Sequence, residues 1–182
     1  MSKNALIACF ALLLALVAGF LFWHKPASLN EYRGEKISFR YPENYLKEPK
    51  TMLESTNLVS LVKVQASDPL AIIELYKEKG AILGANITKA PFLDYLDVAV
   101  DKNQSVTRHD YKKQSLKRIK ISDKDASRLS FSYLYSDNKT RLYFNFFIIP
   151  AGNDAYYLLV SSVDQAKSKQ DAERVQPTIE LH

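Results

Sequence analysis

The sequence predicts an α+β domain, an antiparallel sheet of five to seven strands sandwiched by helices, preceded by an N-terminal membrane helix. Three observations carry this prediction. Strand-like segments are separated by short turns, which is typical of antiparallel sheets. One segment repeats apolar residues at the spacing of a helix face. The N-terminus contains nineteen consecutive uncharged residues, which matches the length of a membrane span.

The composition narrows the class of protein. A chain of 182 residues, 47% hydrophobic and 25% charged, fits one domain with an appendage. These values exclude a polytopic membrane protein, a disordered chain and a collagen. The single cysteine excludes a disulfide scaffold and a cysteine-rich zinc site. With only five glycines, a glycine-rich phosphate-binding loop is not expected.

Residues 1–25 are predicted to form a transmembrane anchor or a signal segment. The uncharged residues 5–23 would span the hydrocarbon core, and they lack the polar stripe of a core helix. The run is longer than the apolar region of a usual signal peptide and has a poor cleavage site, which favours a retained anchor. The side chains expected in the membrane include Leu6, Phe10, Leu13, Leu14, Val17, Phe20 and Trp23.

The N-terminal charge predicts the orientation. A short basic start, with Lys3, before an apolar run is typical of a signal anchor, so the C-terminal domain is expected on the non-cytoplasmic side, most simply at the bacterial inner membrane facing the periplasm. Residues 6–9, Leu-Ile-Ala-Cys, also match a bacterial lipobox. Because only eight residues precede Cys9, a small apolar residue inside a membrane helix is the favoured interpretation. Both interpretations tether the domain to a membrane.

Residues 26–30 are predicted to be a linker and residues 31–182 a single domain. The first half of this domain contains three segments whose apolar residues alternate or cluster as in strands. These segments are residues 36–41, 58–64 and 71–76. Prolines end or separate them, at Pro42 and at Asp68-Pro69.

A helix is predicted to follow Pro91, which suits the first turn of a helix. The apolar residues on one predicted face are Phe92, Tyr95, Leu96, Ala99 and Val100. Three aspartates lie on the other side: Asp94, Asp97 and Asp101. They are expected to form a solvated face rather than a metal site, because no second group of ligands accompanies them.

Four further strands and a closing helix are predicted. The strands lie at residues 112–121, 127–135, 141–149 and 156–163. The last two are apolar on both faces, so both faces must be covered. Asp164 is expected to cap a helix that runs through Val175. The many aromatic residues of these strands are interpreted as core rather than as a platform for a ligand.

The opening strand and the turn after it, residues 36–45, have the sequence KISFRYPENY. In this motif an aromatic strand runs into Tyr-Pro, which is followed by an acidic residue and a further aromatic residue. This motif and the order of elements after it resemble PsbP-like domains over residues 31–182. That group includes the PsbP subunit of photosystem II, a GTPase-binding nuclear transport factor and bacterial DcrB-type envelope proteins. The resemblance implies an α/β/α sandwich that docks onto larger assemblies, usually without catalysis. It implies no site residues.

The basic residues are concentrated in one segment. Residues 101–128 contain nine basic and four acidic residues, so this window carries the whole net charge of +5. A docking patch for an acidic partner or anionic lipid is predicted at Lys112, Lys113, Lys117, Arg118 and Lys120. The alternative is an edge strand that uses lysines to resist pairing with other chains. Nucleic acid is not expected as a partner.

No catalytic residue, metal site or cofactor is predicted, because the three histidines lack metal-ligand spacing and no catalytic motif occurs. The favoured function is a non-catalytic, membrane-tethered accessory or scaffold subunit of a cell-envelope complex, whose partners are the membrane and other subunits. One alternative is an envelope module that binds a small anionic or apolar ligand in a pocket between sheet and helix. The other is an enzyme, marked by a cleft that holds His109 or paired carboxylates.

Overall fold

The computed structural model describes residues 28–48, 57–81 and 92–182. The predicted membrane segment, residues 1–25, lies outside these ranges, as do Pro91 and residues 26–27 of the predicted linker. Neither helix in the described ranges is long and apolar enough to cross a bilayer.

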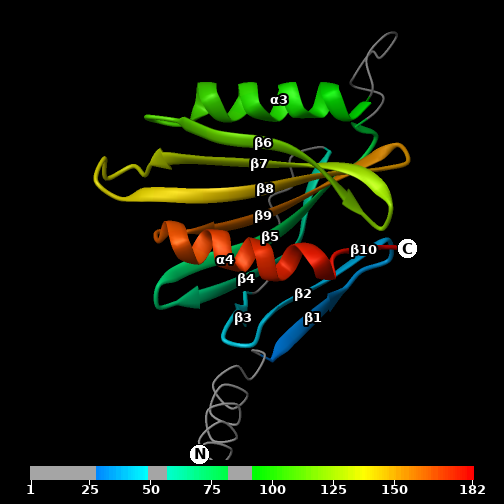
Figure 1. The fold of residues 1–182 in the computed structure, drawn as a ribbon, viewed down its shortest axis with the longest axis horizontal. Coiled ribbons are helices and arrows are strands. Elements are labelled where there is room, and N and C mark those ends of the chain that lie inside the picture. The colour runs from blue at the N-terminus through cyan, green and yellow to red at the C-terminus, as the bar shows by residue number, and fades with distance from the viewer. Residues whose placement is uncertain (1–27, 49–56, 82–91) are drawn as a thin grey trace, which may run out of the picture.

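The described strands form two sheets (Figure 1). The small sheet has the order β1 (Leu29–Arg33), β2 (Ile37–Pro42) and β10 (Glu180–Leu181). The large sheet is antiparallel throughout, and in spatial order its strands are β3 (Leu46–Lys47), β4 (Leu58–Ser67), β5 (Leu70–Glu78), β9 (Asp154–Ser162), β8 (Arg141–Ala151), β7 (Lys124–Leu134) and β6 (Lys112–Ile121). The predicted antiparallel sheet of up to seven strands is confirmed.

Two details of the strand prediction are wrong. The first predicted strand, residues 36–41, belongs to the small sheet and not to the large one. The turn between β6 and β7 is also tighter than the gap left between the predicted strands, residues 122–126. Ser122 and Asp123 both have positive φ, 48° and 64°, which suits a two-residue hairpin turn, and β7 begins at once with Lys124.

The helices α3 (Phe92–Thr107) and α4 (Gln165–Val175) cover opposite faces of the large sheet. Successive residues of β8 show this, because Phe147 packs in the core on the α4 side and Ile148 packs under α3. In Figure 1, α3 runs along the β6 end of the sheet, whereas α4 crosses nearer its middle. The prediction that β8 and β9 are covered on both faces is confirmed.

The core on the α4 side is the larger of the two. The small sheet contributes Phe39, the large sheet contributes Leu158 and α4 contributes Val175, all almost fully buried. Asp164 caps α4 as predicted, since its carboxylate accepts a hydrogen bond of 2.7 Å from the Lys167 backbone N–H. A short 3₁₀ helix, Gln176–Thr178, then leads into β10.

The buried face of α3 differs from the predicted one. Its buried residues are Leu93, Leu96 and Asp97, whereas the Tyr95 side chain, which was expected to be buried, is 37% exposed. Asp97 is only 4% exposed, so the expected solvated row of aspartates is also wrong. The physical reason is a set of contacts with Arg118 and Ser127 of the sheet, which draw this carboxylate inward.

Candidate functional site

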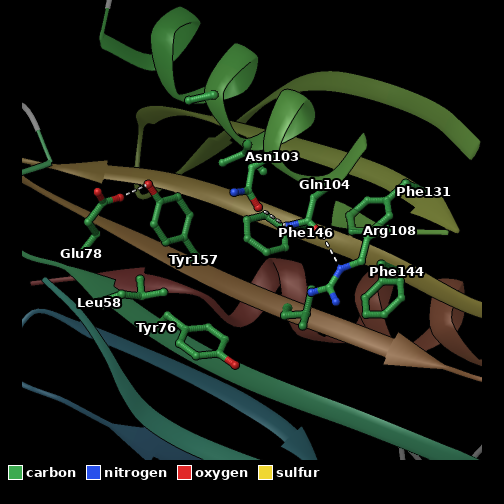
Figure 2. A pocket seen from close by; sticks show the side chains of 13 residues that line it. Leu58, Tyr76, Glu78, Asn103, Gln104, Arg108, Phe131, Phe144, Phe146 and Tyr157 are labelled. Atoms are coloured by element: carbon green, nitrogen blue, oxygen red, sulfur yellow. Dashed lines mark hydrogen bonds between the residues drawn. The ribbon is translucent and has the colours of Figure 1, made fainter. Parts of the chain in front are cut away.

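A cleft of about 600 Å³ lies between α3 and the sheet (Figure 2). Its apolar lining comes from β4, β5, β7, β8, β9 and α3: Leu58, Tyr76, Ala99, Val100, Phe131, Phe144, Phe146, Tyr157 and Leu159. Its polar lining consists of Glu78, Asn103, Gln104 and Arg108. The lining is therefore mostly hydrophobic with a few polar groups, which is typical of a small-molecule site.

The floor of the cleft is built from alternate residues of neighbouring strands. Every second residue of a strand faces the same side, so Phe144 and Phe146 of β8 share the α3 face with Leu159 of β9. The rings of Phe131 and Phe144 are stacked, with centroids 4.9 Å apart and an interplanar angle of 7°. These rings support one another, so the floor is a rigid aromatic surface.

The position of α3 leaves part of this floor uncovered, at Phe146 and Leu159. The helix is fixed to the β6 side of the sheet through Arg118, which pairs with Asp94 and Asp97, and through Lys113, whose Nζ lies 2.5 Å from Asp101 Oδ2. On the other side of the helix the packing is incomplete, because Val100 packs against the buried Phe131 and Phe144, whereas Phe146 and Leu159 are only partly buried and line the cleft. The ion pairs on the β6 side of α3 therefore determine where the cleft opens on the other side of the helix.

Two charged residues lie at opposite ends of the cleft (Figure 2). The Arg108 guanidinium lies over the Tyr133 ring, 4.9 Å from its centroid, and its Nε donates a hydrogen bond of 3.3 Å to Gln104 Oε1. Within the described residues Arg108 forms no ion pair. Glu78 accepts a hydrogen bond from the Tyr157 hydroxyl, whose pKa is raised by burial and by this contact. The Tyr157 hydroxyl is neutral and does not compensate the Glu78 carboxylate, so the cleft has a negative charge at one end and Arg108 at the other.

The lining of the cleft contains few acidic or basic side chains. His109, proposed as a possible catalytic residue, is not among the lining residues, and Glu78 is the one carboxylate there. In the described ranges, no group of three or more His, Cys, Asp or Glu is arranged to hold a metal ion.

The five residues of the predicted docking patch do not form a single group. Lys113 and Arg118 bind aspartates of α3. Lys112 and Lys120 pair with acidic neighbours at exposed positions, at distances of 3.4 Å to Asp110 and 2.7 Å to Asp125. Lys117 lines a separate cavity on the α4 side. A docking role for these residues stays a prediction.

A pocket between sheet and helix was one of the alternatives predicted from the sequence, but its lining residues were missed because these aromatic residues have the same pattern as core residues. The signal in the sequence that could have revealed the cleft is that the strand carries more apolar surface than the helix facing it. Strand β8 is aromatic on the α3 side, whereas the last turns of α3 carry Asn103, Gln104 and Thr107. A helix that is polar there cannot cover the aromatic surface beneath it.

Comparisons with known proteins identify the fold. No protein-family model matches the chain, and no curated protein matches it. The structure is similar to that of cyanobacterial PsbP (CyanoP) from Synechocystis sp. PCC 6803, with a TM-score of 0.56 and 11% identity over 87% of this chain and 95% of that chain. It is also similar to LpqN, which is involved in cell envelope biogenesis of Mycobacterium tuberculosis, with a TM-score of 0.55 and 12% identity over 84% of this chain and 91% of that chain. The predicted PsbP-like α+β fold is thereby confirmed, and the closer likeness to DcrB-type proteins stays a prediction.

Proposed function

We propose that this protein is a non-catalytic, membrane-tethered accessory module of the cell envelope that binds an amphipathic ligand in the cleft between α3 and the sheet. The ligand has an apolar body and an anionic head group. The observation that carries the proposal is the aromatic cleft of about 600 Å³ with Arg108 at one end.

The apolar part of the ligand follows from the floor of the cleft. Phe144 and Phe146 offer ring faces, and Leu159 and Val100 add aliphatic surface. Each methylene group removed from water contributes about 0.8 kcal/mol, so an alkyl chain or fused ring is the class that gains most from this surface. The volume lies within the usual range for ligand sites.

The anionic head group follows from Arg108. The ring of Tyr133 and the amide of Gln104 hold its guanidinium in place, so less conformational entropy is lost when it binds. A guanidinium donates paired hydrogen bonds to a carboxylate, sulfate or phosphate. The Glu78 carboxylate at the far end would repel an anionic head group, which therefore belongs at Arg108.

Two observations support the envelope as the place of action. The uncharged residues 5–23 predict a tether to a membrane. The fold is shared with LpqN, whose function lies in envelope biogenesis. As an accessory subunit the module would present its remaining exposed basic residues, Lys112 and Lys120, to an acidic partner, while Lys113 and Arg118 hold α3.

The test is calorimetric titration of the full chain in phosphatidylcholine nanodiscs with octyl sulfate and with octyltrimethylammonium, using empty nanodiscs as the blank. We expect the anionic probe to bind and the cationic probe not to. Arg108→Gln should weaken octyl sulfate binding about tenfold, which is the loss of one charge-assisted contact. Equal binding of the two probes, or an unchanged affinity in Arg108→Gln, would contradict the anionic part of the proposal.

A matched pair of variants tests the position of the site. Ala99→Phe places a ring in the cleft from the helix side and should abolish binding. Val98→Phe adds the same ring at the neighbouring position, which is 67% exposed and points away from the cleft, and should leave binding unchanged. If both variants bind octyl sulfate as the wild type does, the cleft is not the site.

A further inference from the structure

A second cavity, of about 210 Å³, lies on the opposite face of the sheet, between β6, β7, β8 and α4. Its charged lining residues are Lys117, Arg128, Lys169 and Glu173. Lys169 and Glu173 are 4.0 Å apart and exposed, so they interact weakly with each other. Three cations and one carboxylate leave this cavity with an excess of positive charge.

Two of these cations are forced together by the strand register. Lys117 and Arg128 are directly opposite each other in the antiparallel β6–β7 pair, and both line the cavity. Like charges in this arrangement destabilise a sheet. In the part of the chain that the structure describes, neither residue forms an ion pair with a carboxylate. Glu173 is the one carboxylate in the lining, and it acts on Arg128 without contacting it, so the three cations of the cavity are only partly compensated.

The Arg128 guanidinium is held in a defined position. Its Nε and Nη2 donate hydrogen bonds of 3.0 Å and 2.7 Å to Asn145 Oδ1, its Nη1 donates one of 3.3 Å to Gln176 Oε1, and it lies over the Phe147 ring. Asn145 is itself fixed, because its amide donates to Ser168 of α4 and its oxygen also accepts from Ser130. Three of the five N–H groups of a guanidinium are thus used, and two remain to donate.

All the partners that hold Arg128 are neutral amides. An amide oxygen satisfies hydrogen bonds but does not compensate the charge of a half-buried cation, and burial accordingly lowers the pKa of Arg128 from its ordinary value. A bound anion would offset both this cost and the repulsion from Lys117. An edge strand that merely resists pairing needs outward lysines, not a fixed arginine with an amide behind it.

We propose that this cavity binds an oxyanion of the phosphate class, with Arg128 and Lys117 as its charged donors and Lys169 at its rim. The volume is that of several water molecules, which suits a phosphate group with some of its hydration. The group is either free phosphate or the head group of an anionic lipid, since the recognising chemistry is the same. This site is separate from the α3 cleft, so each proposal can fail without the other.

The experiment is titration of the full chain in phosphatidylcholine nanodiscs with inorganic phosphate, at constant ionic strength set by chloride and followed by calorimetry. We expect saturable binding by the wild type and at least tenfold weaker binding by Lys117→Gln. Lys124→Gln is the matched control, because Lys124 lies at the exposed end of the same hairpin and is not among the lining residues, and it should bind as the wild type does. Arg128→Lys keeps the charge but loses the planar fork, and it should also weaken binding.

Stability provides a second readout that a purely structural role would not produce. Without phosphate, Lys117→Gln should be slightly more stable than the wild type, because like-charge repulsion is removed. With phosphate, the order should reverse, because only the wild type gains from the bound ion. No binding above that of chloride, or equal binding by Lys117→Gln and Lys124→Gln, would overturn the proposal.

Nanodiscs that contain phosphatidic acid separate the two sources of the group. If a lipid head group occupies the site, phosphatidic acid should weaken the apparent affinity for inorganic phosphate in the wild type and leave Lys117→Gln unaffected. If the ligand is free phosphate, the lipid should have no effect. Either result supports a phosphate-binding site, and the difference between them shows whether its ligand is a lipid head group or free phosphate.

Discussion

The two helices of this protein cover the same sheet in different ways. The helix α4 is fixed by burial, and its buried residues are Ser168, Asp171, Ala172 and Val175. The helix α3 buries less, and its buried residues are Leu93, Leu96 and Asp97. Its main polar contacts lie along one side, with β6, and the other side faces a cleft.

Because of this difference, the α4 face of the sheet contributes mainly to stability, and the α3 face carries the candidate binding site. On the α4 side, Phe39 of the small sheet and Val175 close the core. On the α3 side, aromatic surface is left available because charge pairs at the edge hold the helix in place of apolar packing over the whole face. A sheet that is stabilised on one face can keep a ligand site on the other. Variants that change one face of the sheet and not the other test this division between a stabilising face and a binding face.

The largest expected effect comes from two neighbouring leucines of β9. Leu158 is 0% exposed in the α4-side core, whereas Leu159 lines the cleft. Leu158→Ala should lower the free energy of unfolding by about 3 kcal/mol, because it leaves a cavity in a closed core. Leu159→Ala should lower it by about 1 kcal/mol, because its side chain borders space that already exists. Urea-induced unfolding of the full chain, followed by circular dichroism, measures both.

The same pair should show the reverse order in binding. Leu159→Ala removes apolar surface from the cleft and should weaken octyl sulfate binding, whereas Leu158→Ala should leave it unchanged in the folded protein. Equal losses of stability in the two variants would mean that the α3 face is as closed as the α4 face, and the division would then fail.

A smaller effect is expected at the ion pairs that hold α3. Arg118 Nη1 lies 2.7 Å from Oδ2 of the buried Asp97. Arg118→Gln should lower the free energy of unfolding by about 2 kcal/mol at pH 7, less than for a fully buried pair, because the arginine is half exposed. Lys120→Gln breaks an exposed pair with Asp125 and should cost less than about 0.5 kcal/mol.

The cost of Arg118→Gln should depend on pH in a defined direction. Burial raises the pKa of Asp97 above its ordinary value, and Arg118 opposes that rise. A carboxyl with a raised pKa favours the folded state when it is protonated, so this contribution is lost as the pH increases from about 4 through the folded-state pKa. Without Arg118 the pKa rises further. The deficit of the variant should therefore be small at pH 4 and full at pH 7, and a deficit that does not change with pH would contradict this account.

The strands and helices could be predicted from sequence because each follows a local pattern. The alternation in β2, the two-sided apolar runs of β8 and β9, and the cap at Asp164 are all encoded within a few residues. The buried state of Asp97 is not encoded locally, because its partners Arg118 and Ser127 follow by more than twenty residues. Local periodicity alone assigns an aspartate to the solvated face.

The residues that line the cleft could not be predicted for a related reason. Phe144 and Phe146 have the same alternation whether a helix covers them or not, and the coverage depends on where α3 is fixed. That position is set by ion pairs between α3 and the basic strand β6. The basic residues of this strand were predicted from the sequence to form a docking patch. The pairing of Lys117 with Arg128 likewise became visible only once the strand register was known.

The smallest expected effect compares the C-terminal turns of the two helices. The last turn of α4 carries Arg174, whose charge interacts favourably with the helix dipole, whereas the last turn of α3 has no basic residue and exposes Val106 at 77%. Val106→Lys replaces a β-branched residue with a better helix former and adds a favourable charge, so it should raise the free energy of unfolding by about 0.5 kcal/mol. Arg174→Val makes the opposite change in α4 and should lower it by a similar amount. If unfolding in urea shows a gain well above 1 kcal/mol for Val106→Lys, the stability of α3 is set by its own helix propensity rather than by its attachment to β6.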